Sequence, residues 1–174
     1  MCPRVATLIK DSQWNMSTEA VLRMSKQEVH TASGGLFAGN RKSIGQGAIV
    51  NISSGAGIRG HPELAAYCAS KHGVHGVTRA MAKDWPHIRM NAVAPGMNNF
   101  RRSENLTGAD GDGLGVIETP ILANTPEVAA RTLAKIPSGR MGQPEDVADT
   151  IIFLLSDASA WMTGQILSIN GGSD

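Results

Sequence analysis

Several short runs along this chain are rich in apolar residues, among them 47–53, 88–94 and 165–169. Short runs that are apolar on successive positions are typical of strands buried inside a parallel sheet. The pattern therefore predicts strands at 47–53, 88–94 and 165–169.

The longer segments between these runs favour helices. Alanine-rich sequence follows Pro62, a residue that suits the first turn of a helix, and it predicts a long helix at 62–84. Further helical segments are expected at about 17–32, 120–124, 126–135 and 144–156.

Strands and helices alternate along the chain, which predicts an α/β fold with right-handed crossovers. The expected architecture is a truncated Rossmann-like parallel sheet of about three strands, flanked by helices. The length of 174 residues is that of one domain, so 1–174 is expected to form a single truncated domain. The stretch between the helix at 17–32 and residue 46 is expected to be a loop, and 97–115 an inserted, solvated loop rich in turn-forming residues.

Charge and cysteine content argue against several classes of protein. The formal net charge is +1 without a long basic run, so the sequence does not favour nucleic-acid binding. It contains no apolar run of ~20 residues and no signal-like start, so no membrane segment is predicted. Two cysteines, Cys2 and Cys68, do not make a disulfide framework, and a cytoplasmic location is expected.

The most specific pattern in the chain combines a hydroxyl, a phenol and an amine. Ser54 follows the first predicted strand, Tyr67 lies 13 residues later, and Lys71 lies four residues after Tyr67. Residues four apart on a helix share one face, so the ammonium would lie beside the phenol. A phenol ordinarily titrates near ~10, and a nearby cation favours its ionised form. The three residues predict a proton-transfer site, in which Ser54 donates a hydrogen bond to a substrate oxygen.

The sequence around these residues closely resembles the short-chain dehydrogenase/reductase family. The resemblance begins with Ile49-Val-Asn-Ile-Ser-Ser54, Gly57 and Tyr67-Cys-Ala-Ser-Lys71. Similar blocks follow in the family's order at 88–96, 116–120, 139–148 and 163–172.

The resemblance implies an oxidoreductase that interconverts a hydroxyl and a carbonyl on a small molecule with NAD or NADP. Ser54 would polarise the reacting oxygen, Tyr67 would be the acid/base, and Lys71 would favour the ionised phenol and hold the nicotinamide ribose. Asn15 is the match for the family's fourth catalytic residue. Further cofactor contacts are expected from Pro95, Gly96, Ile117 and Thr119.

The sequence departs from the family pattern in its first third. It lacks the Gly-x-x-x-Gly-x-Gly turn, the ribose-selecting residue and the Asn-Asn-Ala-Gly block. The glycine-rich stretch 34–39 does not follow an apolar strand, as a phosphate-binding turn requires. The family's amino-terminal dinucleotide-binding half is therefore expected to be missing, and cofactor binding to be weak or absent.

Two other functions remain open from the sequence. The same residues could transfer protons without a cofactor, as an isomerase, dehydratase, lyase or cyclase on a degenerate family scaffold. Alternatively, the chain is a non-catalytic, truncated member of the family. A metal site is not predicted, because Cys68, His72 and His75 share a helix face but lack an evident fourth ligand.

The predicted strand at 47–53 lies inside a seven-stranded sheet in the family, so one of its edges is expected to be uncovered here. An uncovered apolar edge favours pairing with another chain. Small residues on the helix at 62–84, namely Ala66, Ser70 and Gly73, permit close approach of a second helix. By resemblance, family members commonly dimerise through this helix. A homo-oligomer through helix 62–84 and the strand edge is therefore expected, with a small molecule as substrate.

Overall fold

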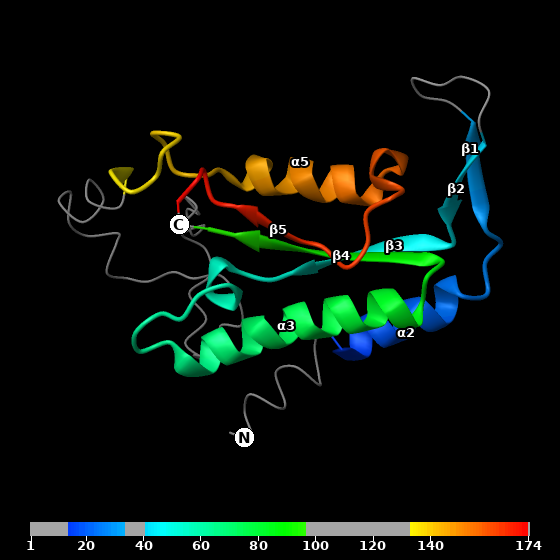
Figure 1. The fold of residues 1–174 in the computed structure, drawn as a ribbon, viewed down its shortest axis with the longest axis horizontal. Coiled ribbons are helices and arrows are strands. Elements are labelled where there is room, and N and C mark those ends of the chain that lie inside the picture. The colour runs from blue at the N-terminus through cyan, green and yellow to red at the C-terminus, as the bar shows by residue number, and fades with distance from the viewer. Residues whose placement is uncertain (1–13, 34–40, 97–132, 174) are drawn as a thin grey trace, which may run out of the picture.

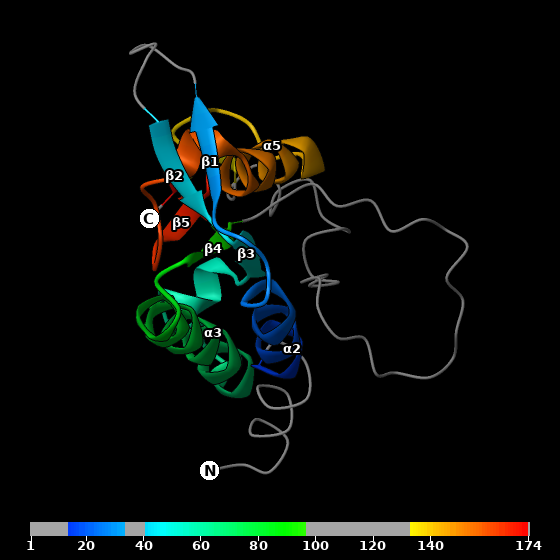
Figure 2. The same ribbon diagram turned by 90° about the vertical axis from the view of Figure 1, so that its right-hand side faces the viewer.

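The computed structural model describes residues 14–33, 41–96 and 133–173. These residues form a three-layered α/β arrangement around a three-stranded parallel sheet (Figure 1). The strands are β3 (Gly47–Ile52), β4 (Ile88–Pro95) and β5 (Ile166–Ile169), in the order β3-β4-β5. Helices α2 (Asn15–Met24) and α3 (Ala65–Asp84) lie on one face of the sheet, and α5 (Pro144–Leu155) covers the other (Figures 1 and 2). The predicted fold class is therefore confirmed.

Strand β4 is the centre of this sheet. It pairs in parallel with β3, from Gly47 opposite Ile88 to Ile52 opposite Val93, and with β5 on its other side. Residues 88–94 are all buried, as expected for a strand covered on both faces. Parallel pairing brings the carboxyl ends of β3, β4 and β5 to the same edge, where open α/β sheets bind their ligands.

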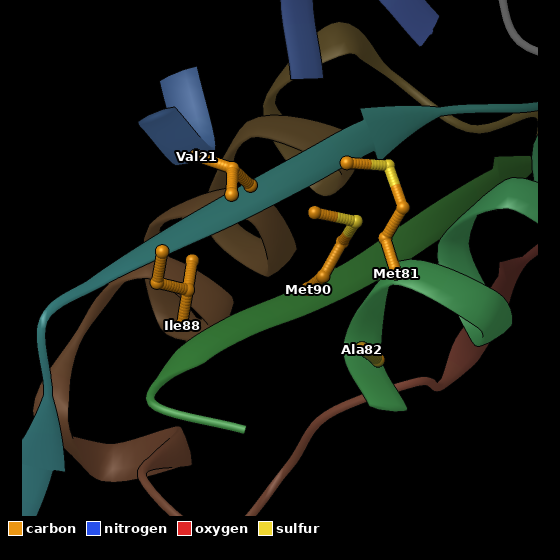
Figure 3. Close-up of a cluster of buried hydrophobic side chains, with 5 residues drawn as sticks. All are labelled: Val21, Met81, Ala82, Ile88 and Met90. Carbon is orange, nitrogen blue, oxygen red and sulfur yellow. The ribbon is translucent and has the colours of Figure 1, made fainter. Parts of the chain in front are cut away.

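The apolar core lies between the sheet and helices α2 and α3. Figure 3 shows the five buried side chains that form it, and they come from three different elements: Val21, Met81, Ala82, Ile88 and Met90. Burial of this apolar surface is what holds both helices to the sheet.

A buried polar residue of the sheet contacts the same two helices. Asn51 of β3 accepts a hydrogen bond from Ser17 Oγ of α2 at 3.2 Å and donates one to Thr78 Oγ1 of α3 at 3.0 Å. Asn51 is 5% exposed, so losing either partner would leave a desolvated amide. These two hydrogen bonds fix the positions of α2 and α3 along β3. Apolar packing alone would allow the helices to slide.

Arg89 fixes α5 to the opposite face of the sheet. Its guanidinium, buried with the rest of the residue, donates to Leu154 O and to Ser159 Oγ, both at 2.7 Å. It also reaches the carbonyl oxygens of Leu155, Ser156 and Ser159. The last carbonyls of a helix lack partners within the helix and carry partial negative charge, so a buried cation satisfies them well.

Two helix boundaries differ from those predicted. The helix expected at 62–84 begins at Ala65, because Glu63 adopts a positive φ of 65° that helical backbone does not permit. The helix expected at 17–32 spans Asn15–Met24 instead. The polar residues after Met24 offer little apolar surface to bury against the sheet, and the chain turns there.

The sequence predicts a loop between the helix at 17–32 and residue 46, and this prediction is wrong in part. The structure has an antiparallel pair of strands here, β1 (His30–Ser33), which begins within the range predicted to be helical, and β2 (Arg41–Gly45). Neither segment shows the apolar alternation by which a half-buried strand is recognised in sequence. The loop predicted at 97–115, the segment 120–124 and most of the segment 126–135 lie outside the described residues.

Two short 3₁₀ helices complete the described chain, η2 (Gly55–Gly57) after β3 and η3 (Asp157–Ser159) after α5. Among the helices that the structure describes, none has the length and apolar character needed to cross a membrane.

We predict that Arg89→Met destabilises the protein by about 3 kcal/mol, because it leaves helix carbonyls and the Ser159 hydroxyl desolvated without their cation. The measurement is the urea midpoint of unfolding. Arg23→Met is the matched control, since Arg23 forms an exposed i,i+4 pair with Glu19 and its loss should change stability by no more than ~0.5 kcal/mol. Equal effects of the two substitutions would contradict the role given to Arg89.

Candidate active site

Ser54 stands where β3 ends and η2 begins. Its backbone is still extended, and its Oγ caps η2 by accepting a hydrogen bond from the Ala56 amide at 3.2 Å. Ser54 is 6% exposed. Because the oxygen acts as acceptor in this cap, the hydroxyl proton remains available to donate to a bound group.

Tyr67 and Lys71 lie one turn apart near the start of α3, and both are half-buried. The Lys71 ammonium is 5.6 Å from the centroid of the Tyr67 ring, within the range of a cation–π contact. It also donates a hydrogen bond to Ile52 O at 3.3 Å. Ile52 is two residues before Ser54, so the structure brings the lysine and the phenol to the strand end that carries the serine.

Burial lowers the pKa of Lys71. Removal from water penalises the ammonium relative to the neutral amine. The Ile52 carbonyl and the electron-rich face of the ring offset part of this cost. Negative charge developing on a neighbouring oxygen would offset more of it, which is the electrostatic condition for a cation that assists proton transfer.

Sequence reasoning missed a second polar pair beside these residues. Ser53 Oγ lies 2.7 Å from His75 Nε2 and donates to Lys71 O at 3.3 Å. Burial, reinforced by the nearby positive charges of Arg79 and His72, lowers the pKa of His75. The available signal is spacing, because His75 lies one turn beyond Lys71 on the same helix face.

Close approach of η2 to α3 depends on Gly57. A Cβ atom built there would lie 2.8 Å from Lys71 O and 2.9 Å from both Cε1 and Nε2 of His75. Real Cβ atoms do not occupy such positions, so this residue must lack a side chain if the Ser54 turn is to pack against the helix.

The predicted cofactor residues Pro95 and Gly96 lie at the same sheet edge. Pro95 ends β4, and the Gly96 amide donates to Ile169 O at 2.8 Å. A Cβ atom on Gly96 would come within 2.7 Å of Asn170 Cβ, and one on Gly55 within 3.6 Å of Pro95 O. The turns that follow β3 and β4 are therefore neighbours, as parallel pairing requires.

Of the remaining predicted residues, Asn15 lies within the described part of the chain, where no hydrogen bond joins it to this group. Asn15 begins α2 with an exposed side chain, and Ser17 is the residue of that turn that contacts β3. The catalytic role of Asn15 stays a prediction. Ile117 and Thr119 lie outside the described residues. On α3, His72 Nδ1 contacts Cys68 O while His75 faces Ser53, and no cluster suited to a metal ion occurs in the described part of the chain.

Most of the sequence matches models of known protein families. Residues 18–108 match the family model of short chain dehydrogenases, and residues 113–174 match a model described as enoyl-(acyl carrier protein) reductase. The first match contains Ser54, Tyr67 and Lys71. Asn15 precedes it.

Curated relatives and solved structures agree with these matches. The chain is 45% identical over 129 residues to a 3-oxoacyl-(acyl-carrier-protein) reductase of Thermotoga maritima, covering 72% of this chain and 45% of the relative. It is 43% identical over 130 residues to 2-(S)-hydroxypropyl-CoM dehydrogenase 3 of Xanthobacter autotrophicus, covering 73% of this chain and 46% of the relative. A structure of 4-hydroxyisoleucine dehydrogenase complexed with NADH is similar with a TM-score of 0.67 and 27% identity, over 91% of this chain and 53% of that one. The chain thus spans about half the length of these relatives.

We predict that Gly57→Ala destabilises the protein by about 1–3 kcal/mol, because the added methyl group forces η2 away from α3. Gly60→Ala is the matched control, since a Cβ atom there meets nothing within 4 Å. Thermal unfolding of both variants checks the prediction. If Gly57→Ala unfolds at the wild-type temperature, the close packing of η2 on α3 is not essential.

Proposed function

The chain belongs to the short-chain dehydrogenase family, and we propose that it carries the proton-transfer site of an oxidoreductase that interconverts a hydroxyl and a carbonyl group. The observation that supports this most is the convergence of the Ser54 turn with the first turns of α3. Ile52 binds the Lys71 ammonium, and Ser54 follows Ile52 by two residues. All three reactive groups thus belong to one sheet edge.

In the proposed reaction, the substrate oxygen lies between the phenol of Tyr67 and the hydroxyl of Ser54. Tyr67 accepts the alcohol proton in the direction of oxidation and returns it in the direction of reduction. Ser54 donates a hydrogen bond to the same oxygen, since the contact with the Ala56 amide uses its oxygen as an acceptor and leaves the hydroxyl proton available. Lys71 stabilises negative charge on the phenol oxygen from the same helix face.

The residues of this edge fit the nicotinamide half of NAD or NADP. The Lys71 ammonium has three donors, and one of them is used by Ile52 O. The others have no acceptor among the described residues, so they suit ribose hydroxyls. The Pro95–Gly96 turn lies beside the Ser54 turn and would line the same pocket. When bound, the nicotinamide supplies the hydride acceptor or donor for the carbon that carries the reacting oxygen.

The relatives indicate the substrate class. Their names describe enzymes that act on a 3-oxoacyl group, a hydroxypropyl group and a hydroxylated amino acid. We extend to this chain a small-molecule substrate with one hydroxyl or ketone group. All three named relatives are dehydrogenases or reductases, so they do not support a cofactor-independent isomerase, lyase or cyclase, or a non-catalytic role.

The proposal also includes self-association and a cytoplasmic location. Within the described residues β3 is an edge strand of the sheet, and α3 presents exposed Ala66 with half-buried Ser70 and Gly73. Small side chains at these positions support helix-to-helix contact between two copies. The free, buried Cys68 is compatible with a reducing compartment.

We predict that the purified chain binds NADH or NADPH and that Tyr67→Phe lowers kcat by at least about 100-fold while binding is retained, because the substitution removes a proton-transfer group and keeps the ring. Nicotinamide fluorescence measures binding. Turnover is measured with a panel of 3-oxoacyl thioesters, hydroxy acids and keto acids. Ser70→Ala is the control, since its hydroxyl bonds within the helix to Tyr67 O.

If neither NADH nor NADPH binds at millimolar concentration, the dehydrogenase function proposed for this chain is rejected. Unchanged turnover by Tyr67→Phe would instead remove this phenol from the mechanism.

We predict that the protein is a dimer or larger oligomer at micromolar concentration, and light scattering coupled to gel filtration measures this. Gly73→Glu should shift the distribution to monomer, because a charged side chain would stand between the two helices. A wild-type monomer would exclude the proposed association.

A further inference from the structure

Two buried polar side chains beside the site take no part in the proposed proton transfer. Ser53 and His75 are each 5% exposed, and Ser53 Oγ lies 2.7 Å from His75 Nε2. We propose that this pair positions the reacting groups: it fixes α3 against the end of β3, and thereby fixes Lys71 and Tyr67 relative to Ser54. The inference rests on the function proposed for that site.

The contacts show why the pair acts on Lys71 in particular. Ser53 Oγ donates to the Lys71 carbonyl at 3.3 Å, while the Lys71 ammonium donates to Ile52 O at 3.3 Å. Two consecutive residues of the strand end thus hold one lysine by its backbone and by its side chain. The strand end is itself fixed, because the Ser53 amide donates to Val93 O at 2.8 Å. The Asn51–Thr78 bond holds α3 one turn further along the helix, so the Ser53–His75 bond is the contact that fixes the turn next to Lys71.

The Ser53 hydroxyl lies between two partners. It has one proton, which serves either Lys71 O or His75 Nε2, and the tautomer of the ring decides which atom donates in the Ser53–His75 contact. A glutamine amide has both a donor and an acceptor, so it could replace the imidazole in either arrangement.

The surroundings favour the neutral ring. On α3 the titratable groups near it are His72, with ring centroids 6.2 Å apart, and Arg79. The groups that β3 and η2 place against it are neutral, the Ser53 hydroxyl and the Gly57 backbone. Burial and these positive neighbours together lower the pKa of His75. A lowered pKa keeps the ring neutral over a wider range of pH, which suits a fixed structural contact better than a proton carrier.

The test follows the Lys71 ammonium by NMR, through the pH titration of its ε-carbon shift, in His75→Leu, Ser53→Ala and His75→Gln. We expect the titration of Lys71 to move upward toward the ordinary lysine value in the first two variants, because the loosened junction exposes the ammonium. His75→Gln keeps an N–H donor and should retain the wild-type titration. His72→Gln, in the exposed neighbouring position, should also leave it unchanged.

A merely structural role predicts a different result. His75→Leu and Ser53→Ala would then lower the unfolding temperature and leave the Lys71 titration where it is, and this outcome overturns the proposal. Ser53→Ala removes a single oxygen, so it keeps the test decisive where His75→Leu weakens the fold. The readout needs neither cofactor nor turnover, so the two proposals can fail separately. If the wild-type chain is inactive but the Lys71 titration shifts in His75→Leu and Ser53→Ala, the proposed function is rejected and the positioning role of Ser53 and His75 is retained.

A second readout uses stability. Because the pKa of His75 is lowered on folding, the unfolded chain binds a proton first as pH falls through the ordinary histidine value of about 6.5. The free energy of unfolding should therefore decline below that pH, and the decline should be smaller in His75→Gln than in His72→Gln. Equal declines in both variants would contradict a buried neutral His75. Where turnover is measurable, His75→Leu should lower kcat on the order of tenfold to 100-fold, with His72→Gln unaffected.

Discussion

The junction between α3 and the carboxyl end of β3 decides whether this chain has a site at all. Three consecutive residues, Ile52, Ser53 and Ser54, contribute a carbonyl oxygen, a buried hydroxyl and a candidate reacting hydroxyl. The first two bind Lys71. Because Lys71 shares its helix face with Tyr67, the same contacts carry the phenol to the strand end. Gly57 permits this approach, since any side chain there would meet the Lys71 carbonyl and the His75 ring.

The rest of the described fold makes that junction rigid. Asn51, immediately before Ile52, ties β3 to Ser17 of α2 and to Thr78 of α3. The apolar cluster around Met90 and Met81 packs the same helices onto the sheet, and Arg89 fixes α5 to the far face. A buried polar group tolerates little displacement, because its partners cannot be replaced by water. Polar ties therefore set the positions of the helices, while apolar burial supplies the stability.

The family relationship and the geometry contribute different parts of the functional argument. The chain matches dehydrogenases and reductases over about half of their length, which supports the reaction class. The described residues bring the Ser54 turn to the helix that carries Tyr67 and Lys71, and this geometry supports the proposed proton-transfer role. Glycine-rich phosphate-binding sequence of the family type is not found in this chain, so the affinity for the dinucleotide is the quantity on which the enzymatic role depends.

The sequence by itself determined the three parallel strands, because short runs rich in apolar residues are typical of buried strands, and it determined that Tyr67 and Lys71 share a helix face, because they are spaced by one turn. Local sequence could not determine the hairpin at β1 and β2, which lacks an apolar pattern, or the early end of α2. The partners of Asn51, Arg89 and His75 lie 22 to 70 residues away in the chain. Such contacts are decided by how the layers pack, so the role of His75 as the partner of Ser53, rather than as a metal ligand, was visible only in the tertiary structure.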